Sequence, residues 1–201
     1  MAAAEVAIID GGGANIASLQ YALQRVDANS VLTTDAAIIE AATHVILPGV
    51  GAAAPAMARL NDNNLVPLIR SLRQPLLGIC LGMQLLAAHS EEDDVTCIGV
   101  FPCTASKLRA APENPVPNMG WCRTTICKQH PLLEGIEDGA WFYFIHSFAM
   151  PVVKNTVATA EHTSNFAAIN SAGNFHTAQF HPERSGAAGS RLLRNFLALR
   201  K

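Results

Sequence analysis

Residues 75–84 read Pro75-Leu-Leu-Gly-Ile-Cys-Leu-Gly-Met-Gln84, and they point most directly to the fold class. The apolar residues before Cys80 are typical of a short buried strand, and residues 81–89 favour a helix. At the junction, Gly78-Ile-Cys-Leu-Gly82 has the form glycine, any residue, nucleophile, any residue, glycine. The two glycines permit a sharp turn without a Cβ clash, which exposes the side chain between them at the edge of a sheet. The pattern predicts an α/β fold with Cys80 at a helix N-terminus that favours its thiolate, although a buried structural cysteine is the alternative.

Strand-like and helix-like segments alternate through the first half of the chain. Strands are expected at 6–10, 30–33, 45–47 and 75–79, and helices at 16–25, 36–41, 53–60, 65–71 and 81–89. Short strands follow at 96–108, 121–127, 141–148, 156–160, 166–170 and 175–180, with a hairpin over 171–174 and a closing helix at 189–199. This order predicts one α/β domain over residues 1–201, with a mixed, mainly parallel central sheet flanked by helices.

Composition excludes several classes of function. The 201 residues are 50% hydrophobic and 15% charged, with a formal net charge of -2, so neither disorder nor nucleic-acid binding is expected. The N-terminus lacks the pattern of a signal peptide and no run reaches the length of a membrane span, so a cytoplasmic location is expected. Five cysteines without metal-ligand spacing predict free thiols, no metal site and no cofactor. Glu91-Glu-Asp-Asp94 is expected to be a solvated acidic loop.

A base and an acid for Cys80 occur together in Phe180-His-Pro-Glu183. Residues two apart point the same way in an extended chain, and Pro182 biases His181 towards extended geometry. His181 could then face Cys80 while Glu183 orients the imidazole, as in a Cys-His-acid triad. A histidine beside an unrelated surface glutamate is the alternative.

Pro48-Gly-Val-Gly51 follows an expected strand and should lie at the same sheet edge as Cys80. Glycines there let backbone N–H groups approach a substrate closely, so the N–H groups of Leu81 and of the Gly49–Gly51 segment are candidate donors to an oxyanion. An ordinary turn is the alternative.

Five segments in this order resemble the class I glutamine amidotransferases: LPGVG, GICLGMQ, MGW, YFIHS and QFHPERSG. Within that class they are most similar to the glutaminase subunit of bacterial imidazole glycerol phosphate synthase, an enzyme of histidine biosynthesis. The resemblance spans nearly the whole chain and implies a flavodoxin-like architecture. It also implies that Cys80 attacks the amide of glutamine, that ammonia leaves, and that water resolves a thioester.

The resemblance assigns further residues to the substrate and to a partner. Gln84, His146 and Ser147 match glutamine-binding positions, and Gly49, Val50 and Gly51 match the strand that presents an oxyanion amide. The positions that match the face towards a cyclase subunit, a (β/α)8 barrel that receives the ammonia, are Asn15, Met119, Trp121 and Arg184.

Four positions depart from the usual family pattern: Asn118, Cys122, Phe148 and Arg184. Phe148 stands where tyrosine is common, and Cys122 removes an amide from the partner surface. A stand-alone cysteine hydrolase and a catalytically silent relative remain the other functional hypotheses.

Overall fold

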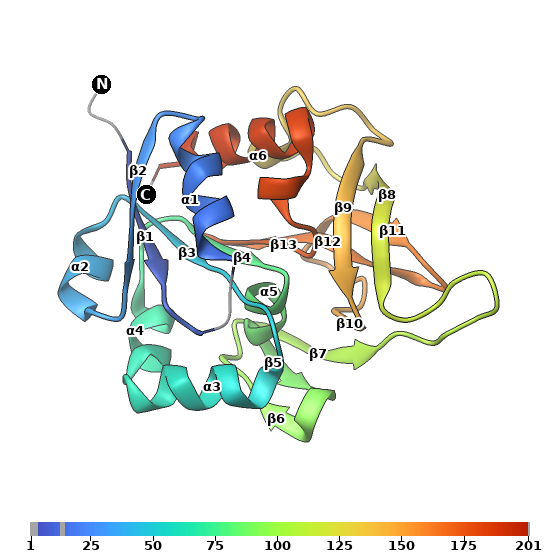
Figure 1. Ribbon diagram of the computed structural model, residues 1–201, viewed down its shortest axis with the longest axis horizontal. Coiled ribbons are helices and arrows are strands. Elements are labelled where there is room, and N and C mark those ends of the chain that lie inside the picture. The colour runs from blue at the N-terminus through green and yellow to red at the C-terminus, as the bar shows by residue number, and fades with distance from the viewer. Residues whose placement is uncertain (1–3, 13–14, 201) are drawn as a thin grey trace.

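The computed structural model describes residues 4–12 and 15–200, and within them the chain forms two sheets and a set of flanking helices (Figure 1). The large sheet consists of β1 (Ala4–Ile9), β2 (Ala28–Thr33), β3 (His44–Leu47), β4 (Leu76–Ile79), β8 (Asn118–Ile126), β9 (Trp141–His146), β11 (Thr156–Glu161), β12 (Asn165–Ala172) and β13 (Phe175–Ala178). The small sheet consists of β5 (Ala87–Ser90), β6 (Val95–Thr96), β7 (Phe101–Lys107) and β10 (Phe148–Ala149).

The helices divide into α-helices and single 3-10 turns. The α-helices are α1 (Ile16–Gln24), α2 (Ala36–Ala41), α3 (Ala53–Asp62), α4 (Leu65–Ser71), α5 (Leu81–Leu85) and α6 (Gly186–Ala198). The 3-10 turns are η1 (Glu92–Asp94), η2 (Pro131–Leu133) and η3 (Pro182–Arg184). None of the helices in the described part of the chain is long and apolar enough to cross a membrane.

The large sheet has a parallel half and an antiparallel half. Its order is β2-β1-β3-β4-β13-β12-β11-β8-β9. Pairing is parallel from β2 to β13 and antiparallel from β13 to β9. β13 therefore lies at the boundary, where Ala178 pairs in parallel with Ile79 of β4. The residues that follow these two strands consequently leave the sheet at the same edge.

Apolar side chains on alternate strand positions pack into two separate cores. Val6 and Ile8 of β1 contribute to the core beneath α1 and α6, whereas Ala7 and Ile9 contribute to the core beneath α2, α3, α4 and α5. Figure 1 shows α1 and α6 on one side of the sheet and α3 and α4 on the other. This layering is the reason residues 6–9 of β1 and all of β4 are apolar and buried on both faces, whereas β2 at the edge of the sheet is partly exposed.

The expected fold class, a single α/β domain with a mixed sheet flanked by helices, is confirmed. The helix expected over 81–89 is wrong in its second part, because α5 ends at Leu85 and Ala87 begins β5. The strand expected over 96–108 is two strands interrupted at Gly99, where φ is 79°. In both places pairing within the small sheet, such as Ala87 with Phe101, prevails over local propensity.

Candidate active site

Cys80 sits on a strained turn between β4 and α5. Its backbone has φ 54° and ψ -113°, a conformation that costs free energy for a residue with a Cβ. The turn is fixed from outside by a hydrogen bond of 2.8 Å from the Cys80 amide to the carbonyl of Ala178. A Cβ added at Gly82 would lie 1.8 Å from the carbonyl oxygen of Leu47, so no larger residue fits there. The glycine–nucleophile–glycine pattern is therefore a packing requirement as well as a conformational one.

The helix that begins after Cys80 is shorter than the sequence indicates. α5 has 5 residues, which is little more than one turn. A helix dipole is the sum of aligned peptide units, so one turn contributes less favourable potential to a thiolate than the expected helix would. Stabilisation of charge on the sulfur must therefore come largely from neighbouring side chains.

His181 and Glu183 form a buried pair beside the turn. The Nδ1 atom of His181 lies 2.8 Å from Oε1 of Glu183, and their side chains are 8% and 7% exposed. His181 has the expected extended geometry, with φ -98° and ψ 100°, but the chain does not stay extended beyond it. Pro182 begins η3, and the Glu183 carboxylate contacts the imidazole from within that turn. Two hydrogen bonds hold the backbone of His181. Its N–H donates to the carbonyl of Tyr143, and its carbonyl accepts from Oγ of Ser185.

The charge state of His181 follows from these contacts. Burial by itself lowers the pKa of His181, but contacts with Cys80 and Glu183 outweigh burial and raise the pKa to about 10. Within the described residues, Nε2 of His181 has no hydrogen-bond partner. At neutral pH the ring is therefore protonated, with one N–H on the carboxylate and the other available to the sulfur or to a substrate.

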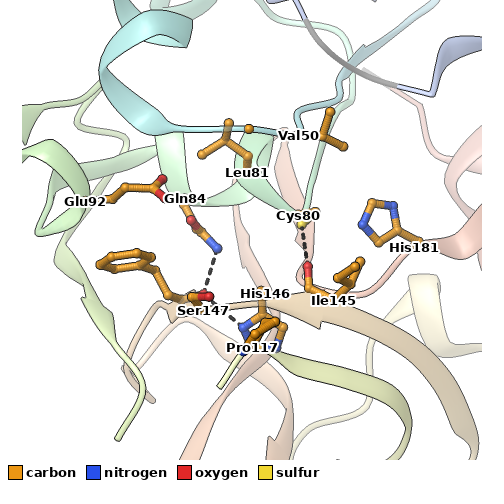
Figure 2. Close-up of a pocket in the computed structure, with 12 residues that line it drawn as sticks. Val50, Cys80, Leu81, Gln84, Glu92, Pro117, Ile145, His146, Ser147 and His181 are labelled. Carbon is orange, nitrogen blue, oxygen red and sulfur yellow. Dashed lines mark hydrogen bonds between the residues drawn. The ribbon is translucent and has the colours of Figure 1, made fainter. Parts of the chain in front are cut away.

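Cys80 and His181 line one pocket of about 270 Å³. The residues around it are Val50, Gly51, Cys80, Leu81, Gln84, Glu92, Pro117, Ile145, His146, Ser147, Phe148 and His181. In the view of Figure 2, Cys80 and His181 lie at one end, and Gln84 and Glu92 lie at the other. The pocket therefore has a reactive end and a polar end, and most residues predicted for substrate binding lie in its wall.

Gly49 is the predicted loop residue that lies outside this wall. It packs directly on the turn, because a Cβ there would lie 2.8 Å from Cβ of Leu81 and 2.9 Å from the amide nitrogen of Gly82. Gly49 instead lines a second, small cavity together with Asn15, His181 and Glu183. The loop therefore contacts the turn itself as well as the pocket.

His146 has both ring nitrogens occupied by protein groups. Nδ1 lies 2.9 Å from the carbonyl oxygen of Phe148, so Nδ1 must carry the proton and donate it. Nε2 lies 3.1 Å from Nδ2 of Asn118, which donates to it. Burial lowers the pKa of His146 to about 4, consistent with this neutral ring. Asn118, one of the departures, therefore supports His146 in the pocket wall.

Sequence reasoning missed two polar residues of the site. Glu92 is half-buried and lines the pocket, so it departs from the expected solvated loop, in which Glu91, Asp93 and Asp94 are exposed. Its Oε2 accepts a bond of 3.0 Å from the amide of Ala53, at the start of α3.

Gln179 is fully buried, and its Nε2 lies 3.8 Å from Sγ of Cys80. Its position two residues before His181, within the segment QFHPERSG, is the signal that could have identified it.

The residues predicted for the partner face lie on the outer surface near the pocket. Met119 and Trp121 of β8 are 66% and 52% exposed. The Arg184 guanidinium lies 4.5 Å from the centre of the Tyr143 ring, next to Trp121. Asn15 caps α1 by accepting a bond from the amide of Ser18, and it lines the small cavity beside His181 and Glu183.

Known proteins resemble this chain in sequence and in fold. The family model of glutamine amidotransferase class-I matches residues 7–199. The imidazole glycerol phosphate synthase subunit HisH of Xylella fastidiosa is 50% identical over 97% of this chain and 98% of its own. The same subunit of Xanthomonas axonopodis pv. citri is 47% identical, with the same coverage. A solved structure described as a glutamine amidotransferase is similar in fold, with a TM-score of 0.73, 18% identity and 96% of each chain covered.

Proposed function

We propose that this chain, which belongs to the class I glutamine amidotransferases, is the glutaminase subunit of an imidazole glycerol phosphate synthase. On this proposal residues 1–201 form one amidotransferase domain that hydrolyses glutamine to glutamate and ammonia for histidine biosynthesis in the cytoplasm. The observation that carries it is a thiol held on a strained turn beside a buried imidazole–carboxylate pair, in a pocket sized for one amino acid.

The triad residues divide the reaction between them. The Cys80 thiolate attacks the side-chain carbonyl carbon of glutamine, and a C–S bond forms. As the C–N bond breaks, protonated His181 gives its proton to the nitrogen, which leaves as ammonia. Water then attacks the thioester while neutral His181 takes a proton from it, and cleavage of the C–S bond releases glutamate and the thiolate. Glu183 keeps the imidazole oriented and stabilises its positive charge.

The negative charge on the carbonyl oxygen requires N–H donors during both steps. The amide of Leu81, directly after the nucleophile, is one candidate, and an amide of the Gly49–Gly51 segment is the other. That segment packs against the turn at Gly49 and borders the pocket at Val50 and Gly51. An amide from this segment can therefore reach the reactive end, provided that the local backbone turns it inwards.

The polar end of the pocket suits the amino-acid portion of glutamine. An α-ammonium group needs an anionic or carbonyl partner when water is displaced. The Glu92 carboxylate borders the pocket and keeps one oxygen free of the bond to Ala53. Desolvation raises the pKa of Glu92. Pairing with an ammonium would offset that unfavourable burial, with Gln84 and Ser147 completing the polar wall.

The outer face of β8 and β9 is the proposed docking surface for the cyclase subunit. Its exposed apolar side chains lie on adjacent strands: Met119, Trp121, Trp141 and Ile145. Arg123 and Arg184 stack on aromatic rings of the same face. Aromatic and arginine side chains grouped in this way are typical of interface hot spots. The relatives are named as subunits of a synthase, which supports a heterodimer with a (β/α)8-barrel cyclase.

The proposal includes control of the glutaminase by its partner. The Gly51 backbone has φ 95°, and its position has open space around it, so this segment has room to change conformation. One oxyanion donor is worth about 3–4 kcal/mol, or ~10²–10³ in rate. A partner that stabilises the donor-in conformation by a comparable free energy would therefore switch on hydrolysis.

One experiment separates this function from the two alternatives. Glutamine hydrolysis is measured for the chain alone, with the cyclase subunit, and with the cyclase subunit and its bound ligand. We expect kcat/KM to rise by about 10²–10³ across the series. Equal rates throughout would refute the gating, activity only on other amides would indicate a stand-alone hydrolase, and no hydrolysis in any condition would indicate a silent relative.

A further inference from the structure

Gln179 is the side chain that contacts the reactive sulfur from inside the protein. It follows β13 directly, it has no exposed surface, and its own amide is bonded to the carbonyl of Ala168. Its side-chain Nε2 lies 3.8 Å from Sγ of Cys80. A fully buried amide is costly unless its polar atoms are bonded, so this contact accounts for part of what keeps Gln179 in place.

The orientation of the Gln179 amide follows from its neighbours. The carbonyl oxygen of Phe148 can only accept a hydrogen bond, so the atom of Gln84 that faces it at 2.8 Å must be the NH2 nitrogen. The same NH2 lies 3.2 Å from the side chain of Gln179, so the atom there must be the oxygen. The NH2 group of Gln179 is consequently directed at Cys80, and the opposite orientation would set two donors against each other.

Besides His181, Cys80 has two polar neighbours of opposite preference. The carbonyl of Ile145, 3.6 Å from Sγ, can accept only from the protonated thiol. The Gln179 NH2 donates to sulfur, and such a bond is stronger when the acceptor is charged. Since α5 is only one turn long, a side-chain donor matters more here than behind a long helix.

We propose that Gln179 is a catalytic residue that stabilises the Cys80 thiolate, and that the chain from the Phe148 carbonyl through Gln84 to Gln179 fixes its donor towards sulfur. The inference rests on the proposed function, because it assigns a role to Gln179 only if Cys80 is the nucleophile. If it holds, activation of the Cys80 thiol depends on Gln179, which directly follows the boundary strand β13, as well as on His181.

The test measures alkylation of Cys80 by iodoacetamide over a pH series in the full-length chain, with peptide mapping to separate the cysteines. Gln179→Leu removes the donor, and Gln179→Glu replaces it with an acceptor of the same shape. A hydrogen bond to a charged group is worth about 1.5–3 kcal/mol, so the pH midpoint of Cys80 alkylation should move up by about one to two units in Gln179→Leu. We expect kcat/KM for glutamine to fall by ~10- to 100-fold in the same variant, and further in Gln179→Glu.

A matched control is available at a second buried glutamine. Gln74 donates to the carbonyls of Ile39 and Glu40, away from the pocket, so Gln74→Leu should leave the Cys80 midpoint unchanged. The exposed Cys127 is the internal reference, and its alkylation profile should be the same in every variant.

Each remaining outcome has a defined meaning. An unchanged Cys80 midpoint in folded Gln179→Leu or Gln179→Glu protein overturns the inference and leaves the proposed function intact. Loss of cooperative unfolding in both variants assigns Gln179 a packing role and also overturns the inference. If wild-type Cys80 reacts no faster than Cys127, the proposed function itself fails.

Discussion

The two halves of the large sheet differ in how their strands are connected and in what they contribute to the site. In the parallel half, short connections lead from strands directly into helices, and Cys80, the proposed nucleophile, sits on one such connection, after β4. In the antiparallel half, strands are joined by hairpins and loops, and one face of β8 and β9 is left exposed with its aromatic residues. The parallel half positions Cys80 on a strained turn, whereas the antiparallel half supplies the outer surface and, through Ile145 and His146 of β9, part of the pocket wall.

The proposed triad is assembled across the boundary between the halves. Cys80 follows β4 and His181 follows β13, and the parallel pairing of these strands brings together residues that are 101 positions apart by number (181 minus 80). The amide of Cys80 is bonded to the last residue of β13, and the amide of His181 is bonded to Tyr143 of β9. Cys80, on the parallel side, is therefore bonded to the boundary strand β13, and His181 is bonded to β9 of the antiparallel half. Substitutions in each half can then be compared for their effects on chemistry, stability and docking.

The largest effect is expected from the nucleophile. Cys80→Ala should lower glutamine hydrolysis at least ~10⁴-fold, because the covalent route is lost. Synthesis that uses added ammonium salts with the cyclase subunit should survive, since only the source of ammonia is removed. Cys97→Ala, at a buried cysteine outside the pocket, is the control. A Cys80→Ala protein that hydrolyses glutamine at a rate near that of the wild type would show that the nucleophile lies elsewhere.

The next prediction compares the loss of stability when one glycine in each half is replaced by alanine. Gly82→Ala places a Cβ against the Leu47 carbonyl and should lower the free energy of unfolding by about 3 kcal/mol. Gly173→Ala, in the β12–β13 hairpin, meets no neighbour within 4 Å and has only its φ of 59° as a penalty. It should cost about 1 kcal/mol. Urea unfolding of the two variants measures the difference, and equal losses would contradict the tight packing of the turn.

Docking should depend on the antiparallel half. Trp121→Ala removes a large exposed aromatic side chain from the outer face of β8 and should raise the Kd for the cyclase subunit by ~30-fold or more. Ile38→Ala, at an exposed apolar residue of α2, is the matched control and should leave Kd unchanged. Titration calorimetry on both variants tests this. The docking surface lies elsewhere if the two variants bind equally well.

The smallest effect concerns selectivity among thiols. Burial raises the pKa of Cys97 to about 11 and also raises the pKa values of Cys103 and Cys122, so these three should be poor nucleophiles at neutral pH. A limited amount of a glutamine-like electrophile should therefore label Cys80 in preference to them, and by ~10-fold over the exposed Cys127. Peptide mapping gives the ratio. Comparable labelling of Cys80 and Cys127 would remove the case for an activated thiol.

Much of the site could be predicted because its signals are local. The two glycines around Cys80 and the proximity of His181 to Glu183 are visible in short segments, and the pocket brings together most of the predicted substrate residues. Glu92 could not be predicted as a pocket residue, because nothing in an acidic tetrapeptide distinguishes the one carboxylate that turns inwards. Its place depends on the bond to the first turn of α3, which is 39 positions away in sequence.

By itself, the sequence determined the alternation of strands and helices, the sharp turn at Cys80 and the presence of a base and an acid near the C-terminus, since each depends on neighbours along the chain. Only the tertiary structure determined that α5 stops after one turn, that η3 turns Glu183 onto His181, and that Gln179 faces the sulfur. The physical reason is that these features satisfy hydrogen bonds and close packing between strands that are distant in sequence. Such contacts exist only once β13 lies beside β4.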